Sequence, residues 1–165
     1  MSKFLLAVDN SPATWKAVDY VEDCLNKHGE IAVHVFHALD PLPPALQESR
    51  GAEHPRDEAK LEAELKREQN AWREKVKMAA EPVVKQVLLK LEQSGTKPEK
   101  ISSEFSALAH REDLPDEILK AAQEAGCDTI VVGRNSFPWV KEIFADHLAE
   151  ELKKNSQGIS VAVID

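Results

Sequence analysis

Short apolar runs alternate along this chain with segments whose apolar residues recur every three or four positions. The runs cover residues 4–8, 31–36, 101–108, 129–132 and 159–164. Runs of this length are too short for helices, and continuous apolar runs are typical of strands buried on both faces of a parallel sheet. The run at 101–108 alternates only in part. We therefore predict five strands separated by helices.

Two of the predicted helices have clear start signals. The first follows Ser11, which can cap it, with Pro12 at the first helical position, and it ends at Gly29. A later helix begins at Leu114 with Asp113 as its predicted N-cap. A further helix is predicted over residues 139–154, after the strand at 129–132.

The middle of the chain is unusual. Residues 40–56 form a Pro-rich segment that we predict to be a loop, and residues 57–94 keep helical spacing across Pro82. We predict one long helix kinked at that proline, about 55 Å in length and longer than a helix that only covers a sheet. Its first half is highly charged with a thin apolar seam, so we expect that half and the loop to be mobile or to contact a partner. Ala45-Leu46 is the predicted anchor of the loop.

Alternating strands and helices predict a single α/β domain, residues 1–165, with an open parallel sheet and helices on both faces. A flavodoxin-like (Rossmann-like) strand order, 3-2-1-4-5, places the ends of the first and fourth strands side by side. Asp9 follows the first strand and Gly133 follows the fourth. We therefore look for a ligand site between these two residues.

Composition narrows the function. The formal net charge of −8 argues against a nucleic-acid surface, which needs a basic face. The two cysteines, Cys24 and Cys127, have no metal-type spacing and are interpreted as free thiols. Apolar stretches are too short to cross a membrane. We expect a cytoplasmic protein with no nucleic acid or membrane as partner.

Two histidines lie in or at the end of the second strand. His34 and His37 are three positions apart, so they face opposite sides of a strand and cannot share a metal ion. We interpret His34 as structural, whereas His37 lies close enough to the strand end to face the ligand site. The sequence has no Ser/His/Asp signature, P-loop or metal cluster, so we predict that the protein is not an enzyme.

The stretch from Asp128 to Leu152 resembles the nucleotide-binding loop of the universal stress protein family. That family carries glycine, two residues, glycine, nine residues, then glycine and serine or threonine. The corresponding positions here are Gly133, Ser136, Asp146 and His147, so the spacing is kept while three of the four residues differ. Asp146 would place a carboxylate beside a polyanion, which His147 would offset only when protonated.

Other positions match the same family. Asp9-Asn10-Ser11 stands where the family has Asp-Gly-Ser, whose aspartate binds the nucleoside. By resemblance, Val35 lies where the backbone contacts adenine, and Val132 and Arg134 belong to the nucleotide site, with Arg134 the local cation for a phosphate. Without a ligand, Asp9 can equally be a carboxylate that only caps the loop.

The resemblance implies a stress-response or regulatory protein whose altered site binds ATP weakly or not at all. The alternative is an ATP- or AMP-binding sensor of the same family, and a third is an adaptor that binds a protein partner through the acidic surface and the long helix. We also predict a homodimer through Ile159–Ile164, because this apolar run lies at the sheet edge without lysine or proline.

Overall fold

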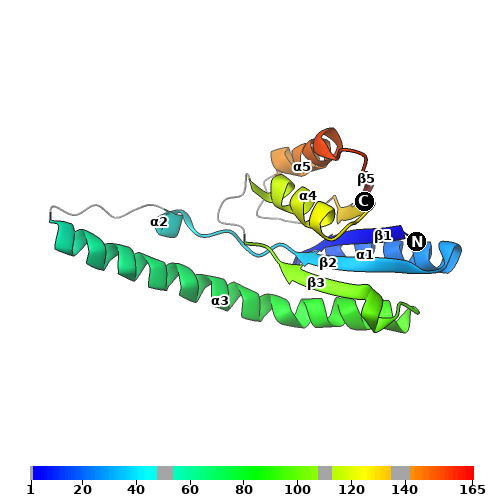
Figure 1. Ribbon diagram of the computed structural model, residues 1–165, viewed down its shortest axis with the longest axis horizontal. Helices are drawn as coiled ribbons and strands as arrows, with labels where there is room; N and C mark the ends of the chain where they lie inside the picture. Colours follow the sequence, from blue (N-terminus) through cyan, green and yellow to red (C-terminus); the bar gives the residue numbers. More distant parts are fainter. Residues whose placement is uncertain (1, 48–53, 108–112, 135–141) are drawn as a thin grey trace.

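The computed structural model describes residues 2–47, 54–107, 113–134 and 142–165, with the side chains of residues 142–147 and 149 left aside. The predicted α/β fold is confirmed (Figure 1). The strands are β1 (Ser2–Val8), β2 (Ile31–His37), β3 (Ile101–Phe105), β4 (Thr129–Gly133) and β5 (Ser160–Ile164). The helices are α1 (Ala13–His28), α2 (Pro44–Gln47), α3 (Pro55–Gln93), α4 (Leu114–Glu124) and α5 (Glu142–Asn155), with a 3-10 turn at Pro98–Lys100.

The strands form one parallel sheet in the order β3-β2-β1-β4-β5, as predicted. Ala7 in β1 lies opposite both Phe36 in β2 and Val132 in β4, so β1 is the centre of the sheet. Parallel strands end at the same edge, and this edge holds the predicted site.

Side chains of each central strand pack alternately on the two faces of the sheet. In β1, Leu5 and Ala7 face α4 and α5, whereas Phe4, Leu6 and Val8 face α1 and the carboxyl-terminal half of α3. Both faces are therefore dry, which explains the unbroken apolar run. Burying a side chain of this size fully contributes about 1.5–3 kcal/mol.

The two cysteines are free, as predicted. Cys24 packs on the face covered by α1 and α3, and Cys127 belongs to the core on the face covered by α4 and α5. The sheet separates them, so they cannot pair with each other. Burial raises the pKa of the Cys127 thiol to about 11, which keeps it protonated at neutral pH.

The predictions for the helix ends are only partly right. Gly29 ends α1 with a φ of 81°, a conformation that favours glycine. Ser11 does not cap α1, because Pro12 takes the N-cap position and the Ser11 hydroxyl donates to Asp9 instead. Asp113 is at the N-cap of α4, but its backbone is helical there and its side chain makes no capping hydrogen bond.

Helix α3 has 39 residues, about 58 Å at 1.5 Å per residue. Its second half buries Ala80, Val84, Val87 and Leu91, while its first half extends beyond the sheet (Figure 1). The helix continues on both sides of Pro82. Pro82 has no N–H to donate to the carbonyl of Met78, four residues earlier. The Met78 side chain is 68% exposed, so this carbonyl lies near water.

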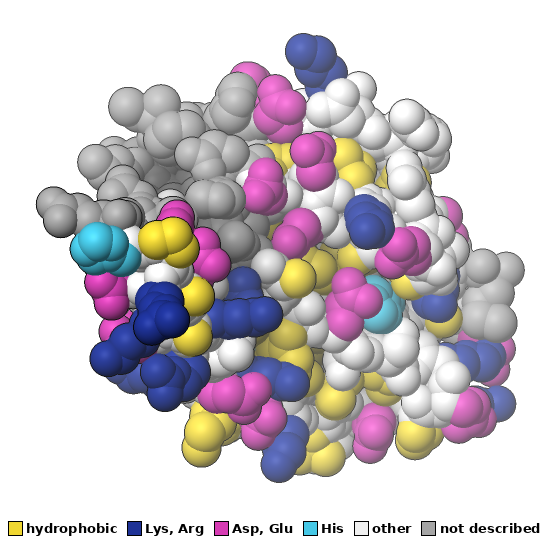
Figure 2. Space-filling view, turned by 60° about the vertical axis from the view of Figure 1, so that its left-hand side comes forward, with side chains coloured by type: hydrophobic (Ala, Val, Ile, Leu, Met, Phe, Trp, Pro, Cys, Tyr) yellow, Lys and Arg dark blue, Asp and Glu magenta, His cyan; other side chains and the backbone are white. Residues whose placement is uncertain are grey.

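The projecting part of α3 packs against α2. The helix begins at Pro55, two residues before the predicted start at Asp57, and the connection from β2 to α3 contains α2. Of the predicted anchor, Ala45 is exposed and Leu46 is half-buried, whereas the neighbouring Pro41 and Leu42 are buried. Gln69 of α3 donates to the Leu46 carbonyl at 2.6 Å. Figure 2, which brings this end forward, shows acidic, basic and apolar side chains interspersed on its described surface.

Strand β3 ends at Phe105, earlier than the predicted Leu108, which lies outside the described residues. The reason is its partner: Phe105 lies opposite His37, where β2 ends. The next residue, Ser106, donates its N–H to the His37 carbonyl at 2.9 Å, and its hydroxyl accepts from the Leu39 N–H at 2.9 Å. Ser106 thereby ties the two strand ends together.

Candidate functional site

The loops that follow β1, β2 and β4 meet at the carboxyl edge of the sheet. Val8 lies opposite His37, and the Val8 carbonyl accepts from the Ala38 N–H at 2.9 Å. Because Ala7 lies opposite Val132, Asp9 and Arg134 each lie two residues beyond this pair. The structure thus brings Asp9, His37 and Arg134 to one edge, as the strand order predicts.

Asp9 is buried, with 3% of its surface exposed, and is held by its own loop. One carboxylate oxygen, Oδ1, accepts from the Ser11 N–H at 3.0 Å and from the Ser11 hydroxyl. The Thr14 hydroxyl lies 3.1 Å from the same oxygen. These contacts fix the direction of the carboxylate. The predicted loop-capping role of Asp9 is therefore present in the structure.

Thr14 is a site residue that the sequence analysis missed. It is fully buried in the first turn of α1, and its hydroxyl accepts from the Asp9 N–H at 2.9 Å and donates to the Asp9 carbonyl at 2.8 Å. The only signal in the sequence is a threonine five residues after the strand-end aspartate. Thr14 joins α1 to the end of β1 and so sets where the Asp9 carboxylate lies.

His37 also faces this edge. Its Nε2 lies 3.0 Å from Oδ1 of Asn10, and its ring packs against Phe105 with centroids 5.8 Å apart. Burial lowers the pKa of His37 to about 4, although the nearby Asp9 carboxylate acts in the opposite direction. His37 is thus neutral at pH 7. Because an amide oxygen can only accept, a hydrogen bond to Oδ1 of Asn10 requires the proton of His37 on Nε2.

The charge at this edge is mainly negative among the described residues. Partial burial, together with the neighbouring Asp9 carboxylate, raises the pKa of Asp40. Arg134, the predicted phosphate cation, is paired through Nε with the carboxylate of Asp165. Its backbone N–H donates to the Ile164 carbonyl at 2.7 Å. Gly133 is the last residue of β4, opposite Ile164, and not a separate turn as predicted.

The two predicted valines are core residues. Val35 is fully buried on the face covered by α1 and α3, two positions before the end of β2. Val132 is 2% exposed and lies on the opposite face, one position before the end of β4. Their side chains are therefore occupied by packing.

The remaining predicted residues are described only in part. Ser136 lies outside the described residues. Asp146 and His147 lie in the amino-terminal half of α5, and their side chains are not described. The described site therefore does not include the side chains at the family's second glycine position and at its glycine-serine pair.

His34 is held by its neighbours on β3, in line with a structural role. Its Nδ1 lies 2.7 Å from the Ser102 hydroxyl, and its Nε2 lies 3.2 Å from the Glu104 carboxylate, in an ion-pair contact without hydrogen-bond geometry. It faces the opposite side of the sheet from His37, because it lies opposite Leu5 and His37 lies opposite Val8. The two histidines thus cannot share a ligand.

Within the described ranges, no group of three or more His, Cys, Asp or Glu side chains could hold a metal ion. In the same part of the chain, no helix combines the length and apolar character that a membrane crossing requires.

Comparison with known proteins identifies the family. The model of the universal stress protein family matches residues 1–158. One similar solved structure is that of "hypothetical protein MJ0577", with 21% sequence identity and a TM-score of 0.68 over 99% of this chain and 94% of that chain. Universal stress protein UspA from Lactobacillus plantarum is 16% identical, with a TM-score of 0.62 over 99% of this chain and 97% of that chain. A universal stress protein in complex with cAMP is also 16% identical, with a TM-score of 0.58 over the same shares of the two chains. At these identities they show a shared fold, and the search among curated proteins found no match. With a family match over nearly its whole length, this chain belongs to the universal stress protein family.

Proposed function

We propose that this universal stress protein is a non-catalytic stress-response protein with an altered nucleotide site that binds ATP weakly or not at all. The observation that carries the proposal is the charge at the carboxyl edge of the sheet. Asp9 and Asp40 lie near each other there, and Arg134 is paired with Asp165. A triphosphate would enter a site whose nearby cation already has a carboxylate partner.

The sequence of α5 supports the same conclusion. Asp146 and His147 replace the glycine and the hydroxyl residue that the resemblance implies for phosphate contact. A carboxylate close to a polyanion repels it, by several kcal/mol where the pair is shielded from water. A histidine offsets that repulsion only when it is protonated, so the phosphate end of the nucleotide is the end that this site disfavours.

The non-catalytic part of the proposal rests on the geometry around the available nucleophile. Ser102, His34 and Glu104 bring a serine, a histidine and a carboxylate together across β2 and β3. Ser102 lies inside the regular strand β3, whose side chains project from the sheet while its N–H groups lie in the sheet plane. Acyl transfer needs N–H donors that converge on the oxyanion beside the serine, and a strand does not supply them.

A second candidate is a sensor of AMP or ATP. One structural neighbour is a universal stress protein in complex with cAMP, which carries one phosphate group. Asp9 stands at the end of β1, where the family's aspartate binds the nucleoside, and its carboxylate is oriented by Ser11. A monophosphate brings less negative charge to the edge than ATP, so this site favours AMP over ATP. An adaptor role through the projecting half of α3 is the third candidate.

The test compares calorimetric titrations of MgATP and AMP into the wild type and the double variant Asp146→Gly, His147→Ser. The proposal predicts a gain of about tenfold or more in ATP affinity for the variant, because one repulsive contact is removed. The matched control is Asp23→Gly, His28→Ser, which makes the same exchange at two exposed positions in the second half of α1, toward the opposite edge of the sheet. An equal gain in both variants would contradict the proposal.

A further inference from the structure

Helix α3 carries a second set of apolar residues on the side turned away from the sheet. Within the described part of the chain, the exposed large hydrophobic side chains are Met78 and Leu89, at 68% and 55% exposure, and both belong to α3. At about 100° per residue they lie on nearly one line, on the opposite side of the helix from the buried Val87. Exposed Ala71 and Pro82 continue this line, and we call the four residues the outer stripe. Figure 1 shows α3 at the border of the molecule, with the sheet to one side.

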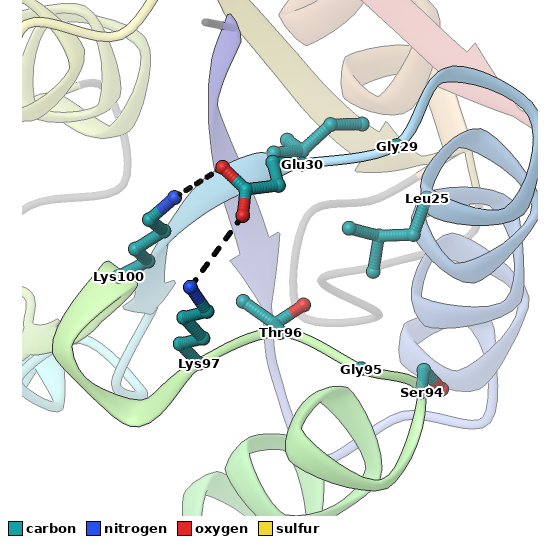
Figure 3. Close-up of a pocket in the computed structure, with 9 residues that line it drawn as sticks. Leu25, Gly29, Glu30, Ser94, Gly95, Thr96, Lys97 and Lys100 are labelled. Carbon is teal, nitrogen blue, oxygen red and sulfur yellow. Dashed lines mark hydrogen bonds and ion pairs between the residues drawn. The ribbon is translucent and has the colours of Figure 1, made fainter.

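The carboxyl-terminal half of α3 is fixed to its neighbours. Ser94, at the C-cap, donates its hydroxyl to Glu22 of α1 at 2.7 Å. In the turn beyond it, Lys97 and Lys100 both pair with Glu30, which immediately precedes β2 (Figure 3). Together with the buried residues of this half, these contacts hold its outer face in a fixed direction.

Charged side chains follow one side of the outer stripe in alternating order. They are Arg67, Glu74, Lys85 and Glu92, all exposed, with spacings of 7, 11 and 7 positions. None of the four has an ion-pair partner within the described ranges. Read from the other end of the helix, the spacings are the same and the signs are reversed. The charge pattern of α3 is thus complementary to its own reverse.

Two α3 helices in antiparallel orientation therefore bring opposite charges together. Centred between residues 79 and 80, such a pair places Arg67 opposite Glu92 of the copy, and Glu74 opposite Lys85 of the copy. Two-fold symmetry makes each contact occur twice. A parallel pair in register would place every charge opposite itself. Because charges beside a helix seam set the orientation of the partner, the pattern favours the antiparallel pair.

The same pairing covers the outer stripe. Ala71 lies opposite Leu89 of the copy, so a small side chain meets a large one, and Met78 lies opposite Pro82 of the copy near the centre. Apolar side chains exposed in the single chain are then removed from water, which stabilises the pair. The projecting half of each α3 also gains the fixed half of the other as a packing partner.

We propose that the outer face of α3 binds α3 of a second copy of this chain, in an antiparallel two-fold pair. Helix α3 packs on β2 and β3, whereas β5 is the opposite edge of the sheet, so this contact is separate from the predicted β5 contact and from the carboxyl edge. A single helix pair is a small interface of the transient class. We therefore expect a dissociation constant of about 100 μM, well above the micromolar range.

The first test is disulfide cross-linking of full-length proteins at concentrations above this value. Ala71→Cys and Leu89→Cys are mixed and oxidised, and the antiparallel pair predicts a linked dimer with one copy of each, because the two positions face each other. Either variant alone, and the wild type with its native Cys24, should give at least several-fold less linked dimer. A mixture of Lys66→Cys and Leu89→Cys is the matched control, since Lys66 is exposed on another side of the projecting half.

The second test reverses charges and measures association by sedimentation in proteins that carry Val161→Pro, so that β5 does not contribute. Glu74→Lys and Lys85→Glu each create two like-charge contacts in the symmetric pair, and each should weaken association about fivefold or more. The double variant restores opposite signs and should associate within about twofold of the parent protein. Glu74 and Lys85 are about 16 Å apart along one helix, so they cannot restore each other within a single copy.

Several results would overturn the proposal. Equal cross-linking of Ala71→Cys alone would show a parallel pair, and equal cross-linking of the Lys66→Cys mixture would show random collision. Absence of linked dimer in the Ala71→Cys and Leu89→Cys mixture would show that the outer stripe does not bind a second copy. A double charge variant as weak as the single variants would also contradict the pairing. If Val161→Pro does not fold, the cross-linking experiment, which keeps β5 intact, decides the question.

Discussion

The imidazole of His37 is tied to Asn10, with 3.0 Å between Nε2 of the histidine and Oδ1 of the amide. This contact joins the loop after β1 to the end of β2. The imidazole ring is buried, since His37 is 1% exposed. Because the ring is buried, its charged form is disfavoured, and protonation of His37 works against the folded state.

The first prediction follows from the lowered pKa of His37, about 4 in the folded protein against a usual value of 6.5. The unfolded chain binds this proton more readily, so stability from neutral His37 is fully present above about pH 6.5 and is lost as the pH falls toward 4. Between pH 7.5 and 5, the wild type should lose about 2 kcal/mol more unfolding free energy than His37→Gln, which does not titrate. Urea titrations at both pH values measure this, and equal losses in the two proteins would contradict it.

A second prediction concerns Thr14. Thr14→Val removes the acceptor of the buried Asp9 N–H and the donor to its carbonyl while keeping the side-chain shape. We expect the unfolding free energy to fall by about 1–3 kcal/mol, the cost of leaving a buried group unpaired. Ser11→Ala, which affects the half-buried end of the same network, should cost less. Denaturant unfolding decides, and a Thr14→Val protein as stable as the wild type would show that the contact is dispensable.

The strands, the helices and the strand-end position of Asp9 were predictable from the sequence because they follow from local patterns: apolar runs closed by a polar residue and connected by helices. The strand order then follows from the flavodoxin-like topology that this alternation favours. The side-chain network was not. Ser11 looks like a helix cap, and only the three-dimensional loop shows that its hydroxyl turns back to Asp9. Arg134 looks like a cation for phosphate, and its partner Asp165 lies 31 residues away in sequence. Contacts of this range depend on the sheet that brings strand ends together.

The third prediction is a homodimer through β5. Ser160 donates its N–H to the Asp128 carbonyl on the β4 side at 3.0 Å, so the N–H groups of the alternate residues Val161 and Val163 point to the open edge. The residues of β5 from Val161 onward are half-buried. A second copy pairing along Ile159–Ile164 would cover them and satisfy the edge.

Val161→Pro removes one outward donor without touching the pairing with β4, and Val161→Thr keeps that donor as the control. Sedimentation at micromolar concentration should show a dimer for the wild type and Val161→Thr, and a shift toward monomer for Val161→Pro. A monomeric wild type would rule the interface out.

The fourth prediction concerns the two halves of α3. In the first half the buried residue is Leu65, whereas Ala80, Val84, Val87 and Leu91 anchor the second half. Amide hydrogen exchange at low protein concentration should therefore be faster over residues 57–64 than over residues 80–91, which serve as the internal reference. Uniform slow exchange along α3 would show that the projecting half is docked in solution.

Titration of MgATP into the wild-type protein in a calorimeter near pH 7.5 measures whether the altered site binds ATP weakly or not at all. We expect no saturable heat up to about 1 mM ligand, which corresponds to a binding free energy weaker than about −4 kcal/mol. A dissociation constant in the micromolar range or tighter, about −8 kcal/mol, would contradict it.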